Sequence, residues 1–348
     1  MTRVLVARLD SAGDVLLAGP AVRAVAASGA EVWMLAGPAG ADAARLLPGV
    51  TGVLVAAVPW VGDATPFDAA ALDELVGRLR AAEFDEAVIL TSFHQSPLPL
   101  AYTLRRAGVR TITGASTDAA GDLLDRRLIP GEDFDEDRPE PLRDLRIASA
   151  AGYQPADDDD LLLEVRPRPD VTAHLAELGE LGQFVAVHPG AAVPARTWPA
   201  EHHAELVRQL VERGHRVVVT GGPGERELTA CVAGDRALDL GGRLAFAELA
   251  GVLERAAVTV VGNTGPAHLS AAVGTPVVSL FSPVVPSIRW RPYGVPIVLL
   301  GDQQAACRLS RARECPVPGH PCLTSVTPGH VVAAVEQLLP AAAGVRGR

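Results

Sequence analysis

Residues 260–281 read VVGNTGPAHLSAAVGTPVVSLF, and this stretch decides the fold class. The apolar run 258–261 predicts a buried strand, and the Gly-Asn-Thr-Gly segment at 262–265 predicts a tight turn after it. A helix is expected to begin at this turn, and the apolar run 277–281 predicts a second strand. Strand, helix and strand in this order form a βαβ unit, whose two strands lie parallel in one sheet.

The same turn predicts a binding site. Backbone N–H groups at a helix N-terminus attract anions such as phosphate, and the small residues Thr264 and Gly265 let a ligand come close. His268 lies four residues after Thr264, so both side chains are expected to face one ligand from the first helical turn. We therefore expect a phosphate- or sugar-binding crevice at the C-terminal ends of parallel strands.

Apolar runs alternate with helical patterns along almost the whole chain, which predicts an α/β protein. Two halves of similar size predict two Rossmann-like domains with parallel sheets, facing one another across a cleft that holds the active site. Strands are expected at 4–7, 32–36, 53–56, 87–90, 111–113, 184–188, 217–220, 237–240, 258–261 and 277–281. Helices are expected at 15–27, 72–82, 200–212, 225–233 and 245–254, with a closing helix at 328–339.

At 348 residues the chain is large for a single core, so two domains are the default. We place an N-terminal domain at 1–165, a C-terminal domain at 166–330, and a closing helix and tail at 331–348. Prolines and a run of four Asp interrupt the alternation at 130–160. We interpret that segment as a solvated acidic linker containing one helix at about 141–151.

Charge is distributed unevenly between the halves. Residues 1–165 hold 26 acidic residues and 14 Arg, a net charge of −12, whereas residues 166–348 carry +2. The chain has no Lys, basic stripe or recognition motif, so nucleic acid is not expected as a partner. The less acidic half is the better candidate to bind an anionic ligand.

Hydropathy predicts a cytoplasmic protein. The apolar content is 48%, yet no uninterrupted apolar run reaches the roughly 18 residues that a membrane span needs. The first ten residues are too short and too charged for a signal peptide and predict a buried strand instead. Contact with a membrane surface is left open, and so is the oligomeric state.

The four cysteines allow two interpretations. Cys307, Cys315 and Cys322, with His320 between the last two, would be a candidate metal site, but their spacing fits no common zinc pattern. We favour a structural loop that contains free thiols or one local disulfide, and we expect no metal site.

The segment 9–17, LDSAGDVLL, predicts a strand end, a tight turn at Ser11–Gly13 and a helix opened by Asp14. In one interpretation Asp14 caps the helix, where the dipole stabilises a carboxylate. In the other, its carboxylate faces the crevice and acts as a general base. The turn lacks the Gly-x-Gly-x-x-Gly pattern of nicotinamide-binding proteins.

Two further turns follow strands of the second half. His188-Pro-Gly190 ends a strand where a loop can approach a ligand through its backbone, and Arg196 offers a fixed charge suited to diphosphate. A surface role for Arg196 stays open, and Trp198 is expected to be structural. Gly221 and Gly222 allow close approach of a nucleotide, and Glu225 could accept hydrogen bonds from ribose hydroxyls.

Taken in order, these motifs resemble glycosyltransferase family 9, which includes the ADP-heptose:lipopolysaccharide heptosyltransferases. The resemblance runs from Arg3 to about Leu339 and is strongest at 11–20, 188–199, 220–225 and 262–283. It implies the two-domain GT-B fold and an inverting transfer that needs neither metal nor cofactor. The C-terminal domain would bind a nucleotide-sugar donor, with an ADP-linked sugar as the expected donor, and the N-terminal domain a glycan or small-molecule acceptor.

The resemblance also implies roles for single residues. Asp14 would take the proton of the acceptor hydroxyl, with Ser11 and Gly13 on the acceptor side, and Arg196 would neutralise the leaving diphosphate. The remaining implied donor-binding residues are His188, Gly190, Gly221, Gly222, Glu225, Leu244, Asn263, Thr264, Gly265 and His268.

One departure from the family concerns Asn263, which stands where the family usually has Asp. That Asp is expected to contact the hydroxyls of the donor sugar, and Asn263 can still donate and accept hydrogen bonds there. The acidic first half further predicts a neutral or cationic acceptor, such as an amino-sugar natural product or a cell-wall glycan. Two other functions stay open: a nucleotide-sugar 2-epimerase of the same architecture, and a nucleotide-sugar binder without catalysis.

Overall fold

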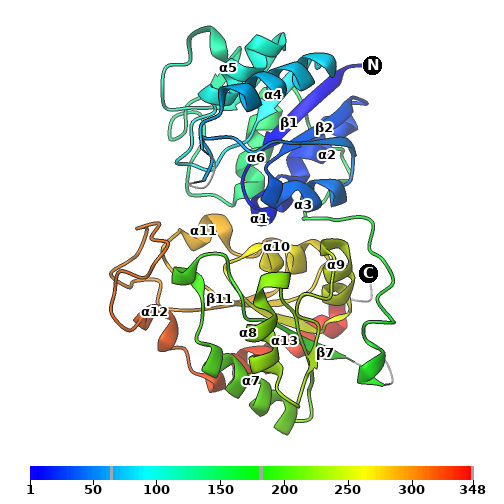
Figure 1. Cartoon of the computed structure of the whole chain (residues 1–348), viewed down its shortest axis with the longest axis vertical. Helices are drawn as coiled ribbons and strands as arrows, with labels where there is room; N and C mark the ends of the chain where they lie inside the picture. Colours follow the sequence, from blue (N-terminus) through cyan, green and yellow to red (C-terminus); the bar gives the residue numbers. More distant parts are fainter. Residues whose placement is uncertain (63–65, 180–182, 346–348) are drawn as a thin grey trace. The chain divides into compact units, whose positions relative to one another are not determined.

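The computed structural model describes residues 1–62, 66–179 and 183–345. The chain divides into two compact units, Met1–Arg166 and Pro167–Arg348. Each unit consists of a parallel six-stranded sheet with helices packed against it (Figure 1).

The sheet of the first unit has the strand order β3-β2-β1-β4-β5-β6, and every neighbouring pair is parallel. Its inner strands are apolar on both faces, as expected for a parallel sheet that helices cover on both sides. The strands are β1 (Arg3–Arg8), β2 (Glu31–Ala36), β3 (Val50–Val55), β4 (Glu86–Ile89), β5 (Thr111–Ala115) and β6 (Arg126–Leu128).

The helices of the first unit form two groups. Helices α4 and α5 pack together over the face that carries Leu5 and Ala7 of β1 (Figure 1). Helices α2 and α6 pack against each other and contact β2 and β5, respectively. The α-helices are α1 (Ala12–Leu17), α2 (Gly19–Ala27), α3 (Ala41–Leu46), α4 (Ala69–Ala81), α5 (Leu98–Ala107) and α6 (Glu140–Ala150); short 3₁₀ turns are η1 (Pro38–Gly40) and η2 (Gly121–Leu123).

The single helix expected at 15–27 is instead two helices, α1 and α2. The break lies at Ala18, directly before Gly19 and Pro20. Proline has no N–H to continue the α1 hydrogen-bond ladder and is favoured in the first turn of a new helix. Because Pro20 starts a new helix, α1 is a short helix that begins just after β1.

The interpretation of 130–160 as a solvated linker is wrong for its central part. Helix α6 does form, but it packs against α2 and buries Glu140, Arg143 and Asp144. A charge count treats acidic residues as solvated, whereas these find guanidinium partners inside the fold. Helix α6 therefore belongs to the first unit.

The second unit repeats the architecture with the strand order β12-β11-β10-β7-β8-β9, again all parallel. Strand β12 was not expected from the sequence. The strands are β7 (Phe184–His188), β8 (Arg216–Val219), β9 (Leu238–Asp239), β10 (Val258–Gly262), β11 (Val277–Leu280) and β12 (Ile297–Leu300).

The helices of the second unit also form two groups: α7 packs against α8 and α13, and α9 packs against α10. The α-helices are α7 (Ala200–Glu212), α8 (Arg226–Ala233), α9 (Phe246–Arg255), α10 (Gly265–Ala272), α11 (Ser287–Trp290), α12 (Pro321–Thr324) and α13 (Pro328–Val345); the 3₁₀ turns are η3 (Ala176–Leu178), η4 (Pro194–Arg196) and η5 (Pro223–Glu225). Helix α13 contacts β10, β11 and β12, so the closing helix is part of this unit.

Numbered from its own first strand, each sheet has the order 3-2-1-4-5-6, which confirms the α/β class. The strand order reverses between β1 and β4 in the first unit and between β7 and β10 in the second. Ligands of open α/β sheets bind beyond the C-terminal ends of strands at such a reversal. In the described part of the chain, no helix is long and apolar enough to cross a membrane.

Candidate active site

The reversal in the first unit centres on Arg8, the last residue of β1. Side chains alternate along a strand, so Arg8 lies on the face of Val4 and Val6, opposite Leu5 and Ala7. The guanidinium is fully buried on that face. A buried arginine needs partners for its charge and its N–H groups, because an unpaired buried charge is strongly destabilising.

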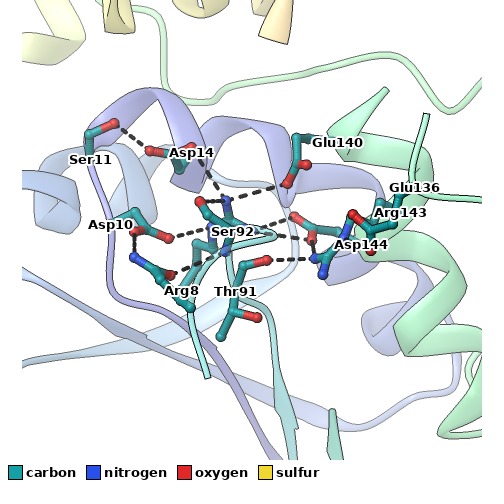
Figure 2. A network of polar contacts seen from close by, with 11 residues as sticks. Arg8, Asp10, Ser11, Asp14, Thr91, Ser92, Glu136, Glu140, Arg143 and Asp144 are labelled. Carbon is teal, nitrogen blue, oxygen red and sulfur yellow. Dashed lines mark hydrogen bonds and ion pairs between the residues drawn. The ribbon is translucent and has the colours of Figure 1, made fainter. Parts of the chain in front are cut away.

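Four carboxylates surround the Arg8 guanidinium (Figure 2). Its Nε lies 3.0 Å from Oδ2 of Asp10, and its Nη1 lies 3.3 Å from Oδ1 of Asp144. Its Nη2 lies 3.3 Å from Oδ1 of Asp14 and 3.6 Å from Oε2 of Glu140, and it donates to the hydroxyl of Ser92 at 3.0 Å. Thus β1, α1, α6 and the loop after β4 meet at one cation.

A second arginine extends this cluster. Arg143 of α6 lies beside Glu136 and Asp144 and donates to the carbonyl of Thr91 in the loop after β4. Gln95 of the same loop donates from its amide to Asp10. The loop after β4 is consequently tied to the end of β1 through Ser92 and Gln95, and to α6 through Thr91 (Figure 2).

The cluster holds more carboxylates than guanidinium groups, and the pKa values of two of its buried carboxylates are raised. Burial raises the pKa of Asp144 to about 7, although Arg8 acts in the opposite direction. Burial likewise raises the pKa of Asp10 to about 6, again against Arg8. Burial alone would lower the pKa of Arg8, but Asp144, Asp10, Asp14 and Glu140 together raise it.

Asp14 is the most accessible of the four carboxylates, since 18% of its side chain is exposed while Glu140 and Asp144 are fully buried. It lies in the first turn of α1, where the helix dipole favours a carboxylate. The hydroxyl of Ser11 donates to its Oδ2 at 2.7 Å, and Gly13 is buried in the same turn. The carboxylate is thus held by one partner on each oxygen at the edge of the sheet.

Sequence reasoning found Asp14, Ser11 and Gly13 but missed Arg8, Asp10, Glu140 and Asp144. The structure therefore places Asp14 among several carboxylates of the first unit. One signal was present: Arg8 follows Val4 and Val6 at strand spacing, so a charge falls on a face otherwise buried.

In the second unit the reversal lies between His188, which ends β7, and Gly262, which ends β10. His188 is buried, and its Nδ1 lies 3.1 Å from the hydroxyl of Thr220 at the end of β8. Burial lowers the pKa of His188, although Glu225 opposes this, and it lowers the pKa of the nearby His203 to about 3. Both imidazoles are therefore neutral at pH 7.

Glu225 folds back over the glycine turns instead of pointing away from them. Its Oε2 accepts a hydrogen bond from the N–H of Gly222 at 2.7 Å and lies 3.8 Å from Nε2 of His188. A Cβ on Gly190 would lie 1.8 Å from Oε1 of Glu225, so only glycine fits there beside this carboxylate. His188, Gly190, Gly222 and Glu225 therefore form one cluster.

The loops after β8 and β9 are joined to each other. The N–H of Gly242 donates to the carbonyl of Gly221 at 2.8 Å, and the half-buried Leu244 follows two residues later, before α9. Leu244 therefore follows the segment that is hydrogen-bonded to the Gly221 turn, and its predicted role in donor binding stays a prediction.

Arg196 lies in the 3₁₀ turn η4, next to the end of β10. A Cβ on Gly262 would lie 3.0 Å from the Arg196 carbonyl, so the glycine permits this close approach. Trp198 is buried, and its indole N–H donates to the carbonyl of Val326 at 3.0 Å. This tryptophan packs and anchors the loop, as its structural interpretation predicted.

The turn from Asn263 to His268 opens helix α10 at the end of β10. Thr264 is the N-cap residue, its side chain makes no capping hydrogen bond, and Pro266 has no N–H. The N–H of Ala267 donates to the Thr264 carbonyl at 3.0 Å. The N–H groups of Thr264 and Gly265 are therefore the ones best placed for an anion, and His268 is buried behind them.

Asn263 is buried, and its amide nitrogen meets no hydrogen-bond acceptor among the residues that the structure describes. A buried amide without an acceptor is unusual in folded proteins and is often a position where a ligand binds. The position that the sequence analysis singled out as the departure from the family is thus a hydrogen-bond donor with unused capacity.

The cysteines carry free thiols. Cys307 and Cys322 are buried, and burial raises the pKa of Cys322 to about 11. His320 lies close to Ala195, with its Nε2 at 3.2 Å from that carbonyl. Across residues 1–62, 66–179 and 183–345, no group of His, Cys, Asp and Glu has the arrangement of a metal site.

Residues 147–320 match the family described as glycosyltransferase family 9 (heptosyltransferase). Because this segment is half of the chain, the chain belongs to glycosyltransferase family 9. The match includes the whole glycine, His188 and Asn263 region of the second unit. Arg8 and Asp14 lie outside it, so their roles rest on the geometry of the first unit.

Lipopolysaccharide heptosyltransferase 3 of Escherichia coli is 30% identical over 167 residues, which are 45% of this chain and 47% of that protein. The chain thus spans about half the length of this curated relative. The solved Escherichia coli ADP-heptose lps heptosyltransferase II is similar with a TM-score of 0.75 at 18% identity, over 98% of this chain and 99% of that one.

A second solved structure, Escherichia coli heptosyltransferase WaaC with ADP, has a TM-score of 0.70 at 19% identity, over 97% of this chain and 99% of that one. At these identities the likeness shows the fold alone. It confirms the expected α/β fold of the GT-B type.

Proposed function

We propose that the protein is an inverting glycosyltransferase that moves a sugar, a heptose by preference, from an ADP-linked donor to an acceptor hydroxyl. Membership of family 9 supports the reaction class. The observation that carries the proposal is the Asp14 carboxylate, held by Arg8 and Ser11 at the strand reversal and still partly exposed. Heptosyltransferase WaaC, which shares the fold, was solved with ADP, and this supports the choice of nucleotide.

In the proposed reaction Asp14 acts as the general base. Its carboxylate takes the proton of the acceptor hydroxyl while that oxygen forms a bond to the anomeric carbon of the donor. The bond from the anomeric carbon to the phosphate oxygen breaks, and its electron pair leaves with the nucleoside diphosphate. Attack on the face opposite the leaving group inverts the configuration at that carbon.

On the donor side, the second unit would bind the nucleotide sugar at its own strand reversal. The N–H groups of Thr264 and Gly265 would hold a phosphate, and Asn263 would donate its buried amide to the donor sugar. Glu225 would accept from ribose hydroxyls beside Gly190 and Gly222. His188 is neutral, so it serves as a hydrogen-bonding group and not as a counter-charge.

Arg196 would supply the positive charge that neutralises the leaving diphosphate. A guanidinium binds two phosphate oxygens at once and keeps its charge at all working pH values. We propose that this charge takes the place of a divalent cation and that the chemistry needs no metal or cofactor.

We propose a neutral or cationic acceptor. The carboxylates Asp10, Glu140 and Asp144 lie directly behind Asp14, and Arg8 and Arg143 do not outnumber them. A phosphorylated acceptor would approach this cluster against repulsion, whereas an amino sugar or an uncharged glycan would not.

Thermal-shift measurements with ADP, GDP, UDP and dTDP test the donor site. A nucleotide at 100 times its dissociation constant stabilises a protein by about 2.7 kcal/mol, and ADP is expected to give the largest shift. If none of the four nucleotides raises the melting temperature, the transferase proposal is wrong.

An Asp14→Asn variant tests the base. It should bind ADP like the wild type but lose transfer about 1,000-fold, because general-base catalysis contributes roughly 100- to 10,000-fold. Asp73→Asn, in which an exposed carboxylate of α4 is neutralised, is the matched control and should keep full activity. Turnover of the nucleotide sugar without any acceptor would favour the epimerase instead.

A further inference from the structure

Asp14 shares its cation with three other carboxylates, and this sharing has a consequence for the proposed base. Asp14 loses its negative charge when it accepts a proton. If it were the sole partner of Arg8, protonation would leave a buried guanidinium without a counter-charge, which is strongly unfavourable. Asp10, Glu140 and Asp144 remain beside Arg8 and keep it paired.

We propose that Glu140 and Asp144 of α6 are positioning residues that act through Arg8, holding it paired while Asp14 accepts the proton and so setting the pH range in which Asp14 works. The inference rests on the role of Asp14 as the base. It assigns a function to the buried carboxylates of α6. These residues are far from Asp14 in sequence, so the motif around Asp14 does not predict them.

The geometry separates the two roles. Glu140 and Asp14 both lie on Nη2 of Arg8, at 3.6 Å and 3.3 Å, whereas Asp144 lies on Nη1. Glu140 and Asp144 are fully buried and cannot meet a substrate in this unit, while Asp14 is 18% exposed. Glu140 therefore competes directly with Asp14 for one nitrogen, and Asp144 holds the other side of the guanidinium.

Several arginines on the surrounding elements contact partners away from Asp14, and Arg146 of α6 is exposed. Arg23 of α2 binds Asp159, and Arg45 of α3 binds Asp42. Arg126 and Arg127 of β6 donate to backbone carbonyls, as Arg143 does to that of Thr91. The groups that face Asp14 and Arg8 from β1, α1, α6 and the loops before them are Asp10, Glu136, Glu140, Arg143 and Asp144.

Removing the charge of Glu140 should make Asp14 a weaker base. In Glu140→Gln the guanidinium loses one competing anion, so its attraction for ionised Asp14 increases and one repulsive neighbour of Asp14 disappears. The midpoint of the Asp14 titration is then expected to fall by about one pH unit, as for loss of a like charge a few ångströms away.

The experiment is a carbon-13 titration of the whole chain labelled at the side-chain carboxyl of aspartate. The spectrum of Asp14→Asn identifies the Asp14 signal. Wild type, Glu140→Gln and Glu140→Ala are then titrated in parallel, and the Asp14 midpoint should fall in both variants. Asp144→Asn should lower it less, because Asp144, with a pKa of about 7, is already largely protonated below pH 6. Glu74→Gln, which neutralises an exposed carboxylate of α4 in the same unit, is the control and should leave the midpoint unchanged.

An Asp14 midpoint that stays at the wild-type value, or rises, in a folded Glu140→Gln or Glu140→Ala protein overturns the inference. Using both variants covers the case in which one of them does not fold. The result is independent of the proposed reaction: a fall in the midpoint without any nucleotide binding would support the coupling and refute the transferase. With transfer established, the acidic limb of the kcat/KM profile should move to lower pH in Glu140→Gln while the donor KM stays unchanged.

Discussion

The C-terminal ends of β1 and β4 and those of β7 and β10 hold the same position in two sheets of the same strand order, yet their chemistry differs. In the first unit a fully buried Arg8 is surrounded by four carboxylates. In the second unit the corresponding edge holds the neutral His188, a set of close-fitting glycines and the buried amide of Asn263. Topology therefore determines where a site lies, and side chains determine what it does.

The difference suggests a division of labour between the units. An ionised cluster suits proton transfer, because its charges adjust when one carboxylate changes its protonation state. Neutral donors and close backbone approach suit recognition of a large anionic ligand. Changes in the first unit should thus alter pH dependence, turnover and stability, and changes in the second should alter nucleotide affinity.

The largest effect is expected from Arg8→Met. Removing the shared cation leaves buried carboxylates without their partner, so the free energy of unfolding should fall by about 3 kcal/mol at pH 8. At pH 5 the loss should be smaller, because Asp10 and Asp144, with pKa values of about 6 and 7, are then largely protonated. Urea denaturation at both pH values measures this. Arg106→Met, which removes an exposed cation paired with Asp73, should have little effect at either pH.

A smaller effect of opposite pH dependence is expected from Asp144→Asn. The folded-state pKa of Asp144 is raised from 3.8 to about 7, so its contribution to stability is present below pH 4 and is lost as the pH rises through 7. Between pH 5 and pH 8 the wild type should therefore lose about 2 kcal/mol of unfolding free energy relative to the variant. An unchanged difference between the two proteins across this range would show that Asp144 does not titrate there.

Gly190→Ala tests the second unit. An ideal Cβ at position 190 would lie 1.8 Å from Oε1 of Glu225, so the added methyl group would displace this carboxylate. We expect nucleotide binding to weaken about tenfold, or about 1.4 kcal/mol, measured by calorimetry with ADP. Gly224→Ala, in the loop after β8, is the control, since a Cβ there has no neighbour within 4 Å. Equal affinities in the two variants would remove Glu225 from the donor site.

The smallest effect is expected from Asn263→Ala. Loss of one buried hydrogen-bond donor should weaken binding of the nucleotide sugar about fivefold, near 1 kcal/mol, and leave binding of ADP alone unchanged. Competition between ADP and ADP-linked sugar measures both affinities. Ser279→Ala, which removes a buried hydroxyl from β11, should change neither. A loss for ADP itself would place Asn263 at the phosphates instead of the sugar.

Most of the fold could be predicted from the sequence because it depends on local patterns. Runs such as 258–261 are mostly β-branched and fully buried, as expected of strands covered on both faces, and Gly-rich turns mark their ends. Errors arose where the sequence signal was short. The helix break before Pro20 and the four-residue strand β12 were not predicted. The prediction that the segment around α6 is solvated was wrong, because its charged residues Glu140 and Asp144 are buried against Arg8 of β1.

The residue clusters of the second unit could be predicted from the sequence, and those of the first unit only in part. Gly190, Gly222 and Glu225 follow strands in recognisable turns, and the structure brings them together with His188. Around Asp14, by contrast, Glu140 and Asp144 come from a helix more than a hundred residues away in the chain. Neither has a local motif, so no pattern could connect them with Arg8.

The sequence by itself determined the α/β class, the alternation of strands and helices and the glycine turns that follow the strands, because strand periodicity and glycine placement are encoded within a few residues. Only the tertiary structure decided the electrostatics of the first unit. The pKa of a carboxylate depends on its burial and on the charges within a few ångströms. Here those charges come from distant segments that meet only when α6 packs against α2 in the first unit.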